Sequence, residues 1–351
     1  MAKPQKKSSK PTASYVIKDE KEKGKVIVAG RTLKQGTVIF TEEPILSTSK
    51  VTEEDILEQY NKLKANEKEK ILSLVTKDED AEDKVKVMSL FKQSSINNTQ
   101  STAGQALYFI LSRVKHSCGP NIVLIPQPDK AFGRIEVRAS RTIKKGEELR
   151  ADYLPGIYLF EPKDIRCKTV FGQKFECDCK VCKLEGPEAA ENEDIRKNIK
   201  ERYRNTTIYV TLADFPQAYD HCKAMLGFME TLENEIFPKR VSVTLECWQL
   251  AVLAKLQRPD IQDDAQKYKE KSKTLCTTLG PLELEKWKKT EKNIEANNFS
   301  EFDTVKLRAS GPWTVETIKK LSEESKIVKE EEAVKDPVKE PAAQKPTVEV
   351  A

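Results

Sequence analysis

Three cysteines lie within six residues, and this spacing constrains the chain more than any other local feature. They are Cys177, Cys179 and Cys182, in the segment FECDCKVC. Thiolates so close in sequence can wrap one tetrahedral zinc ion, whereas disulfides between them would be strained. The spacing therefore predicts a structural zinc site rather than three unconnected buried thiols. The site needs a fourth ligand, and the candidates that the sequence offers are Cys118, Cys167 and His116.

Composition excludes several classes of protein. With 351 residues and 38% hydrophobic side chains, the chain can bury at least one full core, and its length suggests two domains with tails. The 61 basic and 56 acidic residues leave a net charge of only +5, so we expect no direct nucleic-acid binding. No segment approaches the roughly 20 apolar residues of a membrane span, and eight cysteines without a secretory signal indicate reduced thiols. We expect a soluble intracellular protein with no membrane contact.

The first half of the chain is predicted to be a β-rich module that helices interrupt. Apolar runs at 26–30 and 37–40, joined by a turn at Gln35-Gly36, indicate strands, and strand patterns return at 121–143. Between them, residues 51–103 place apolar side chains three and four apart among charges. That spacing is typical of amphipathic helices, so we expect a helical insert there.

The second half is predicted to be helical and to end in a tail. One helix is expected to start at Asp214-Phe215-Pro216, and antiparallel helices should fill residues 190–325. Residues 1–14 and 326–351 have few large apolar side chains, so both are predicted to be disordered tails. The alternative for the first ten residues is a nuclear-import signal.

Two more segments carry chemistry, RVKHSCGPN at 113–121 and GEELRADY at 146–153. Taken alone, His116 is more typical of a structural histidine than of a catalytic one, because no serine or cysteine triad accompanies it. The other histidine, His221, is predicted to be a surface or groove residue. No glycine-rich phosphate loop is visible, which argues against nucleotide hydrolysis.

In this order the motifs resemble the SET-domain protein-lysine methyltransferases. That family has Asn-His-Ser-Cys-x-Pro-Asn, then Gly-Glu-Glu-Leu with a small or acidic residue before tyrosine, then Phe-x-Cys-x-Cys-x-x-Cys. This chain has KHSCGPN at 115–121, GEEL at 146–149 with Asp152-Tyr153, and FECDCKVC at 175–182. Its helical regions are similar to the SET-and-MYND branch, although residues 51–100 hold no cysteine for a MYND finger. The resemblance covers about residues 20–185.

The resemblance implies an α+β fold with four parts. These are a SET β-fold with a pseudoknot at 15–160, its helical insert at 51–103, a zinc-bound post-SET segment at 161–186, and an all-α, TPR-like domain at 190–325. It also implies Cys118 as the fourth zinc ligand. The zinc would clamp the post-SET segment against the segment that contains His116.

The implied activity is transfer of a methyl group from S-adenosylmethionine to a lysine of a protein or peptide, histone or non-histone, in the nucleus or the cytoplasm. Tyr153 is the implied catalytic residue, because its hydroxyl can orient the amine and accept C–H···O contacts from the methyl group. The alternative for Tyr153 is an aromatic side chain packed at a strand end. The implied cofactor-binding residues are Gly24, Lys25, Lys115, His116 and Phe175.

Three positions depart from the family pattern near the cofactor. Val26 replaces a glycine, Lys115 an asparagine, and Gln173 a tyrosine. They favour an alternative function, a catalytically weak or inactive SET-derived module that binds a protein partner. A structural zinc protein of chromatin is a third hypothesis, against which the near-neutral charge argues. The sequence determines neither the substrate protein, nor the degree of methylation, nor the oligomeric state.

Overall fold

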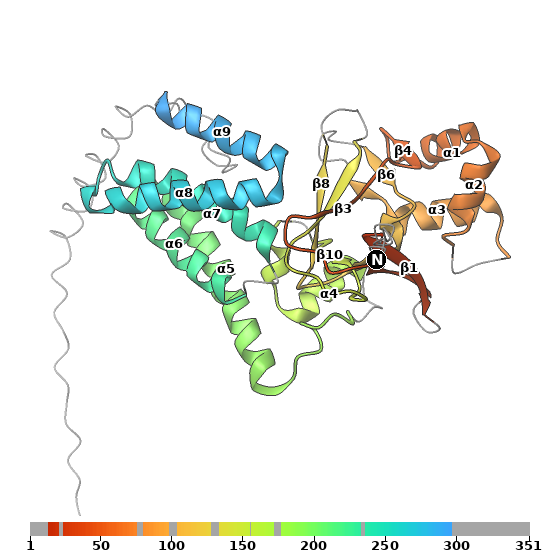
Figure 1. Cartoon of the computed structure of the whole chain (residues 1–351), viewed down its shortest axis with the longest axis horizontal. Coiled ribbons are helices and arrows are strands. Elements are labelled where there is room, and N and C mark those ends of the chain that lie inside the picture. The colour runs from red at the N-terminus through yellow and green to blue at the C-terminus, as the bar shows by residue number, and fades with distance from the viewer. Residues whose placement is uncertain are drawn as a thin grey trace, which may run out of the picture.

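The β-rich part and the helical array lie side by side (Figure 1). The computed structural model describes residues 13–20, 24–75, 80–97, 104–127, 133–154, 156–171, 177–232 and 236–296. The α+β content and the helical C-terminal region are confirmed. Most of both predicted tails lies outside the described residues. None of the described helices is long and apolar enough to cross a membrane.

Short strands build the β-rich part in four small sheets. β1 (Tyr15–Glu20) pairs with β2 (Gly24–Ala29), and a second sheet has the order β3 (Val38–Glu42), β9 (Ile135–Ala139), β8 (Ile122–Pro126). A third has the order β4 (Leu46–Thr48), β6 (Gln105–Leu107), β5 (Ile96–Asn97), and the fourth joins β7 (Lys115–His116) to β10 (Arg150–Ala151). Apolar residues such as Ile27, Val137 and Leu149 fill the core between them.

Three helices lie between β4 and β5, namely α1 (Glu53–Lys62), α2 (Ala65–Leu72) and α3 (Asp83–Ser94). Their apolar positions meet in a small separate core that includes Ile56, Ile71 and Phe91. The Thr52 hydroxyl accepts a hydrogen bond from the amide of Asp55, which caps α1. These helices cover the end of the β-rich part that lies away from the helical array (Figure 1).

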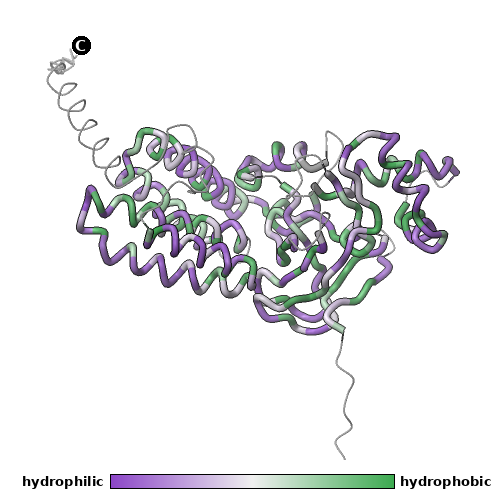
Figure 2. Tube along the Cα trace, turned by 90° about the horizontal axis from the view of Figure 1, so that it is seen from above, coloured by the Kyte–Doolittle hydropathy of each residue, from purple (hydrophilic) through white to green (hydrophobic). Residues whose placement is uncertain are grey.

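The helical array follows the cysteine segment. α4 (Lys163–Phe171) precedes that segment, and the array consists of α5 (Gly186–Thr211), α6 (Phe215–Thr231), α7 (Phe237–Ala254), α8 (Gln262–Leu279) and α9 (Pro281–Glu295). Asp214 caps α6, as its sequence indicates. Hydrophobic positions lie between the helices while hydrophilic ones face outward (Figure 2). Trp248 stacks on Trp287 with ring centroids 5.4 Å apart, which joins α7 to α9.

The two parts meet at the turn that the sequence predicts at Gln35-Gly36. Gly36 has a φ of +80°, a conformation that favours glycine. A Cβ atom at this position would lie 2.6 Å from the carbonyl oxygen of Thr278 on α8. Glycine is therefore required both by the turn and by the close approach of the array.

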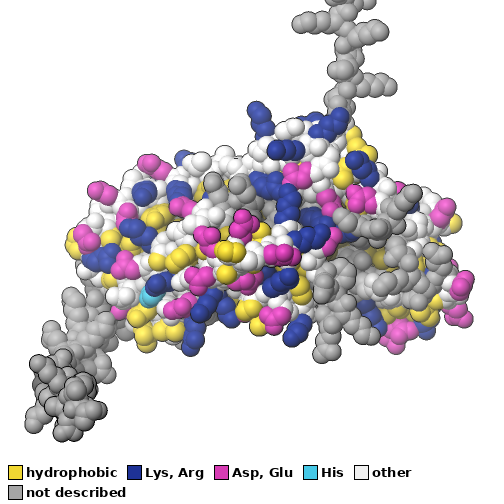
Figure 3. Space-filling model, turned by 90° about the horizontal axis from the view of Figure 1, so that it is seen from below, with side chains coloured by type: hydrophobic (Ala, Val, Ile, Leu, Met, Phe, Trp, Pro, Cys, Tyr) yellow, Lys and Arg dark blue, Asp and Glu magenta, His cyan; other side chains and the backbone are white. Residues whose placement is uncertain are grey.

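On the face in Figure 3, basic and acidic side chains are interspersed.

Candidate functional site

Strands β7 and β10 bring the histidine motif and the acidic motif together. They run parallel, with Lys115–His116 opposite Arg150–Ala151. The buried side chain of Asn121 holds this pair in register: its oxygen accepts from the amide of Arg150, and its nitrogen donates to the carbonyl of Glu148, both at 2.8 Å. Because a buried amide is satisfied at both ends, the two segments form one fixed wall.

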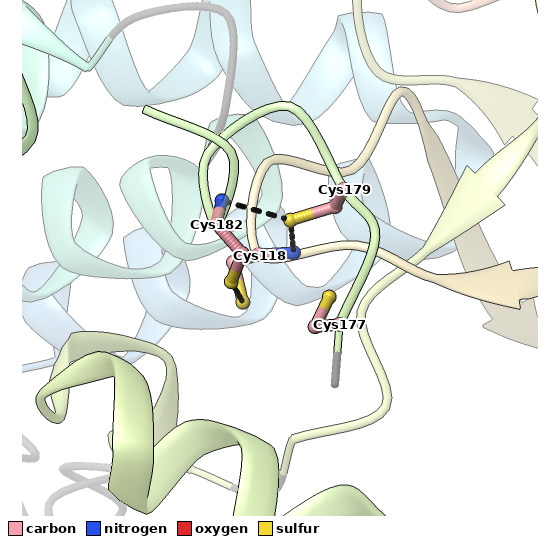
Figure 4. Close-up of side chains that lie close together, drawn as sticks. All are labelled: Cys118, Cys177, Cys179 and Cys182. Carbon is pink, nitrogen blue, oxygen red and sulfur yellow. Dashed lines mark hydrogen bonds between the residues drawn. The ribbon is translucent and has the colours of Figure 1, made fainter. Parts of the chain in front are cut away.

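All four predicted metal ligands lie together in a buried group that we call the cysteine cluster, Cys118, Cys177, Cys179 and Cys182 (Figure 4). Their sulfur atoms all lie within 4.8 Å of one another, and those of Cys118 and Cys182 are 3.6 Å apart. Tetrahedral zinc with bonds of about 2.3 Å would place thiolates about 3.8 Å apart. The cluster can therefore bind a metal ion, and its all-sulfur donor set fits zinc.

Hydrogen bonds already favour the thiolate form at part of the cluster. The main-chain amides of Cys118 and Cys182 each donate to the sulfur of Cys179 at 3.4 Å. A hydrogen bond with Cys118 lowers the pKa of Cys182 to about 6 and lowers that of Cys179 well below its usual value. The thiolate is the form that binds metals. Of the other candidate ligands, Cys167 lies half-buried on α4, outside the cluster.

His116 connects the cluster to Tyr153. Its Nδ1 accepts a hydrogen bond from the main-chain amide of Tyr153 at 3.2 Å, so the proton of the neutral ring lies on Nε2. Nε2 is 3.4 Å from the sulfur of Cys118. Burial lowers the pKa of His116 to about 4, which keeps the ring neutral near pH 7. The ring therefore links the main chain at Tyr153 to the sulfur of Cys118.

Tyr153 is partly exposed, and its hydroxyl is bonded to the main chain of the protein. The side chain is 38% exposed, while the hydroxyl donates to the carbonyl of Val114 at 2.7 Å. Burial of that end raises the pKa of the Tyr153 hydroxyl, so it stays protonated over the physiological range. The oxygen retains lone pairs that can accept a contact from a bound group.

A cavity of about 400 Å³ is lined in part by Val114. This volume lies in the range of roughly 300–1,000 Å³ that small-molecule sites occupy. Three of the five predicted cofactor-binding residues, Gly24, Lys25 and Lys115, line it. His116 is buried in β7 and does not line the cavity, and Phe175 lies outside the described residues, as does Gln173.

The sequence analysis missed three arginines that lie against the site. Arg150 binds the carboxylate of Asp178, inside the cysteine segment, with contacts of 2.5 and 3.1 Å. Arg166 and Arg196 are 1% and 0% exposed and reach Cys118 from α4 and α5. Arginine is a residue that is almost never fully buried unless it is paired. Nothing in the local sequence distinguishes these three from the other basic residues.

Comparison with known proteins shows which domain the chain contains. Residues 24–154 match the SET domain family, so the chain contains a SET domain, and the predicted resemblance is confirmed. Over 100 residues the chain is 34% identical to "Histone-lysine N-methyltransferase SET5" of Yarrowia lipolytica, covering 28% of this chain and 20% of that protein. Over 97 residues it is 32% identical to "N-lysine methyltransferase SMYD2" of Homo sapiens, covering 28% and 21%.

A longer match extends beyond the SET domain. The chain is 26% identical over 198 residues to "Histone-lysine N-methyltransferase set5" of Schizosaccharomyces pombe, which covers 56% of this chain and 58% of that protein. The matches thus span between about a fifth and three fifths of the relatives' length.

Proposed function

We propose that the chain is an S-adenosylmethionine-dependent protein-lysine N-methyltransferase with a structural zinc ion. One observation carries the proposal. Val114 lines the cavity and its carbonyl also accepts the hydroxyl of Tyr153, so the proposed cofactor site and the proposed catalytic group share one residue. Methyl transfer needs such a junction, because cofactor and amine must meet in line at a short distance.

The residues of the cavity fit the cofactor. Gly24 has a φ of +69° at the start of β2 and lines the cavity together with Lys25. Val26, which replaces the glycine of the family pattern, is fully buried and does not line the cavity. Lys115 supplies a cation that can pair with the cofactor's carboxylate.

Tyr153 acts by position rather than as a base. When bound, the cofactor supplies an electrophilic methyl group on a sulfonium. The hydroxyl of Tyr153 stays protonated and is anchored on Val114, so its free lone pairs can hold the amine or the methyl hydrogens in line. The amine loses its proton to solvent before it attacks.

The zinc ion is proposed to join the post-SET segment to the wall formed by β7 and β10. The pseudoknot threading, the TPR-like character of the helical array, the domain boundaries and a nuclear or cytoplasmic location stay predictions. We propose a protein or peptide substrate because the named relatives are lysine methyltransferases. The roles of Tyr153, the cavity residues and the cysteine cluster are likewise proposals.

Two measurements test the proposed function. Calorimetry with S-adenosylmethionine should show one site per chain, and incubation with labelled cofactor and a mixture of histones and cell proteins should place label on lysine. Cofactor binding without label transfer would favour the alternative, a SET-derived binding module. No cofactor binding at millimolar concentration, with zinc present, would contradict the enzyme proposal.

A further inference from the structure

A buried guanidinium lies against the cysteine cluster. Arg166 on α4 is 1% exposed, and its Nε donates to the sulfur of Cys118 at 3.2 Å. Its Nη2 is 3.9 Å from the sulfur of Cys182. Two atoms of one planar group thus point at two sulfurs that come from segments 64 residues apart.

The remaining donors of Arg166 fix its orientation. Nη1 donates to the carbonyl of Glu161 at 2.6 Å, and Nη2 pairs with the carboxylate of Glu193 on α5 at 2.9 Å. The guanidinium is therefore held from both sides and does not depend on the sulfurs for its place. A group anchored in this way is preorganised, so it loses little entropy when it contacts the thiolates.

Charge explains why such a group belongs here. Four thiolates and one divalent cation carry a net charge of −2, and burying an uncompensated charge is costly. A guanidinium compensates half of this charge. Its hydrogen bonds to sulfur also withdraw electron density from the metal–sulfur bonds. Outer-shell hydrogen bonds of this kind orient metal ligands and tune the metal.

We propose that Arg166 is a positioning residue of the zinc site, which holds the sulfurs of Cys118 and Cys182 as ligands and slows loss of the metal. The proposal rests on the proposed zinc site and is independent of methyl transfer. Through Glu193, it also makes retention of the metal depend on α5, the first helix of the array. The helical array is thereby connected to the SET domain through the metal site as well as through the continuous main chain.

Arg196 provides a matched control. It is equally buried and also reaches Cys118, but its Nη2 donates to the carbonyl oxygen at 3.1 Å. Substituting Arg166→Gln or Arg196→Gln removes one buried charge from the same interface between α4, α5 and the SET domain. A purely structural effect would therefore appear in both variants.

The experiment uses the full chain and two readouts. Zinc transfer to an excess of a colorimetric chelator should be about tenfold or more faster in Arg166→Gln than in the parent, and within about twofold in Arg196→Gln. In the cobalt(II)-substituted protein, the sulfur-to-cobalt charge-transfer band should move to lower energy in Arg166→Gln only, because its thiolates lose a donor. Arg166→Lys should restore part of both properties.

Several outcomes would overturn the proposal. Equal acceleration of zinc release in the two glutamine variants would assign the effect to the domain interface. An unchanged cobalt band in Arg166→Gln would show that Arg166 does not donate hydrogen bonds to the metal-bound sulfurs. If Arg166→Gln does not fold, Arg166→Lys and Glu193→Gln decide, since both should release zinc faster than the parent. A parent chain without zinc would contradict this proposal, whereas zinc binding without methyl transfer would contradict only the proposed function.

Discussion

The cysteine cluster and the cavity differ in how far their residues are buried. The four cysteines are at most 7% exposed and are surrounded by main-chain amides, His116 and Arg166. The lining of the cavity combines serine and apolar residues with cationic side chains that include Lys25, Lys86 and Lys115. We therefore expect the buried cysteine cluster to govern folding and the open cavity to govern ligand binding.

The largest expected effect is at the cluster. Cys179→Ser replaces a thiolate that is a proposed metal ligand and accepts two amide hydrogen bonds by a hydroxyl. Because metal binding is coupled to folding, we expect zinc affinity to fall by more than the roughly 10–100-fold that loss of an outer-shell partner costs. Elemental analysis and thermal unfolding measure this. Cys167→Ser is the matched control and should retain one zinc per chain; loss of zinc in it as well would place Cys167 in the site.

The next largest effect is expected at the wall formed by β7 and β10. Asn121→Ala leaves the amide of Arg150 and the carbonyl of Glu148 without their partner. Each buried unsatisfied group costs roughly 1–3 kcal/mol, so we expect the free energy of unfolding to fall by about 3 kcal/mol. Urea denaturation measures it. Asn198→Ala, at a half-buried position of α5 where the side chain donates to Asp194 of the same helix, should change it by less than about 0.5 kcal/mol. Equal effects would show that Asn121 does not hold the register.

At Tyr153, function should change while folding does not. Tyr153→Phe keeps the ring but removes the hydroxyl bonded to Val114. Zinc content and cofactor affinity should stay close to those of the parent, and turnover should fall about tenfold or more, equivalent to about 1.4 kcal/mol. Tyr158→Phe, a nearby exposed tyrosine, serves as control. Unchanged turnover in Tyr153→Phe would leave Tyr153 as packing at a strand end.

The smallest effect is expected at the cavity rim. If the ammonium of Lys115 pairs with the cofactor's carboxylate, Lys115→Asn should weaken S-adenosylmethionine binding about threefold at low salt, because a half-exposed ion pair contributes about 0.2–1 kcal/mol. The difference should shrink at high salt. Calorimetry at two salt concentrations measures both. Tighter binding by the asparagine variant would instead show that Lys115 hinders the cofactor.

The sequence by itself determined the parts of the site that are local. The triplet Cys177, Cys179 and Cys182 indicated a metal site because ligands a few residues apart can meet whatever the rest of the chain does. The motif order indicated the SET domain, and the helix start at Asp214 followed from local capping chemistry. Residue spacing alone left the fourth ligand open among three candidates, and the resemblance pointed to Cys118.

Only the tertiary structure decided what surrounds that site. The buried face of α5 includes Asn192, Arg196 and Thr206, so hydrophobic periodicity does not mark the helix that approaches Cys118. Arg166 looks like any charged residue of an amphipathic helix, yet it lies 48 positions from the sulfur that it contacts. A buried charge is defined by partners that the fold supplies, and local sequence carries no record of them. The same holds for Val114, whose two neighbours, the cavity and the Tyr153 hydroxyl, meet only in the folded chain.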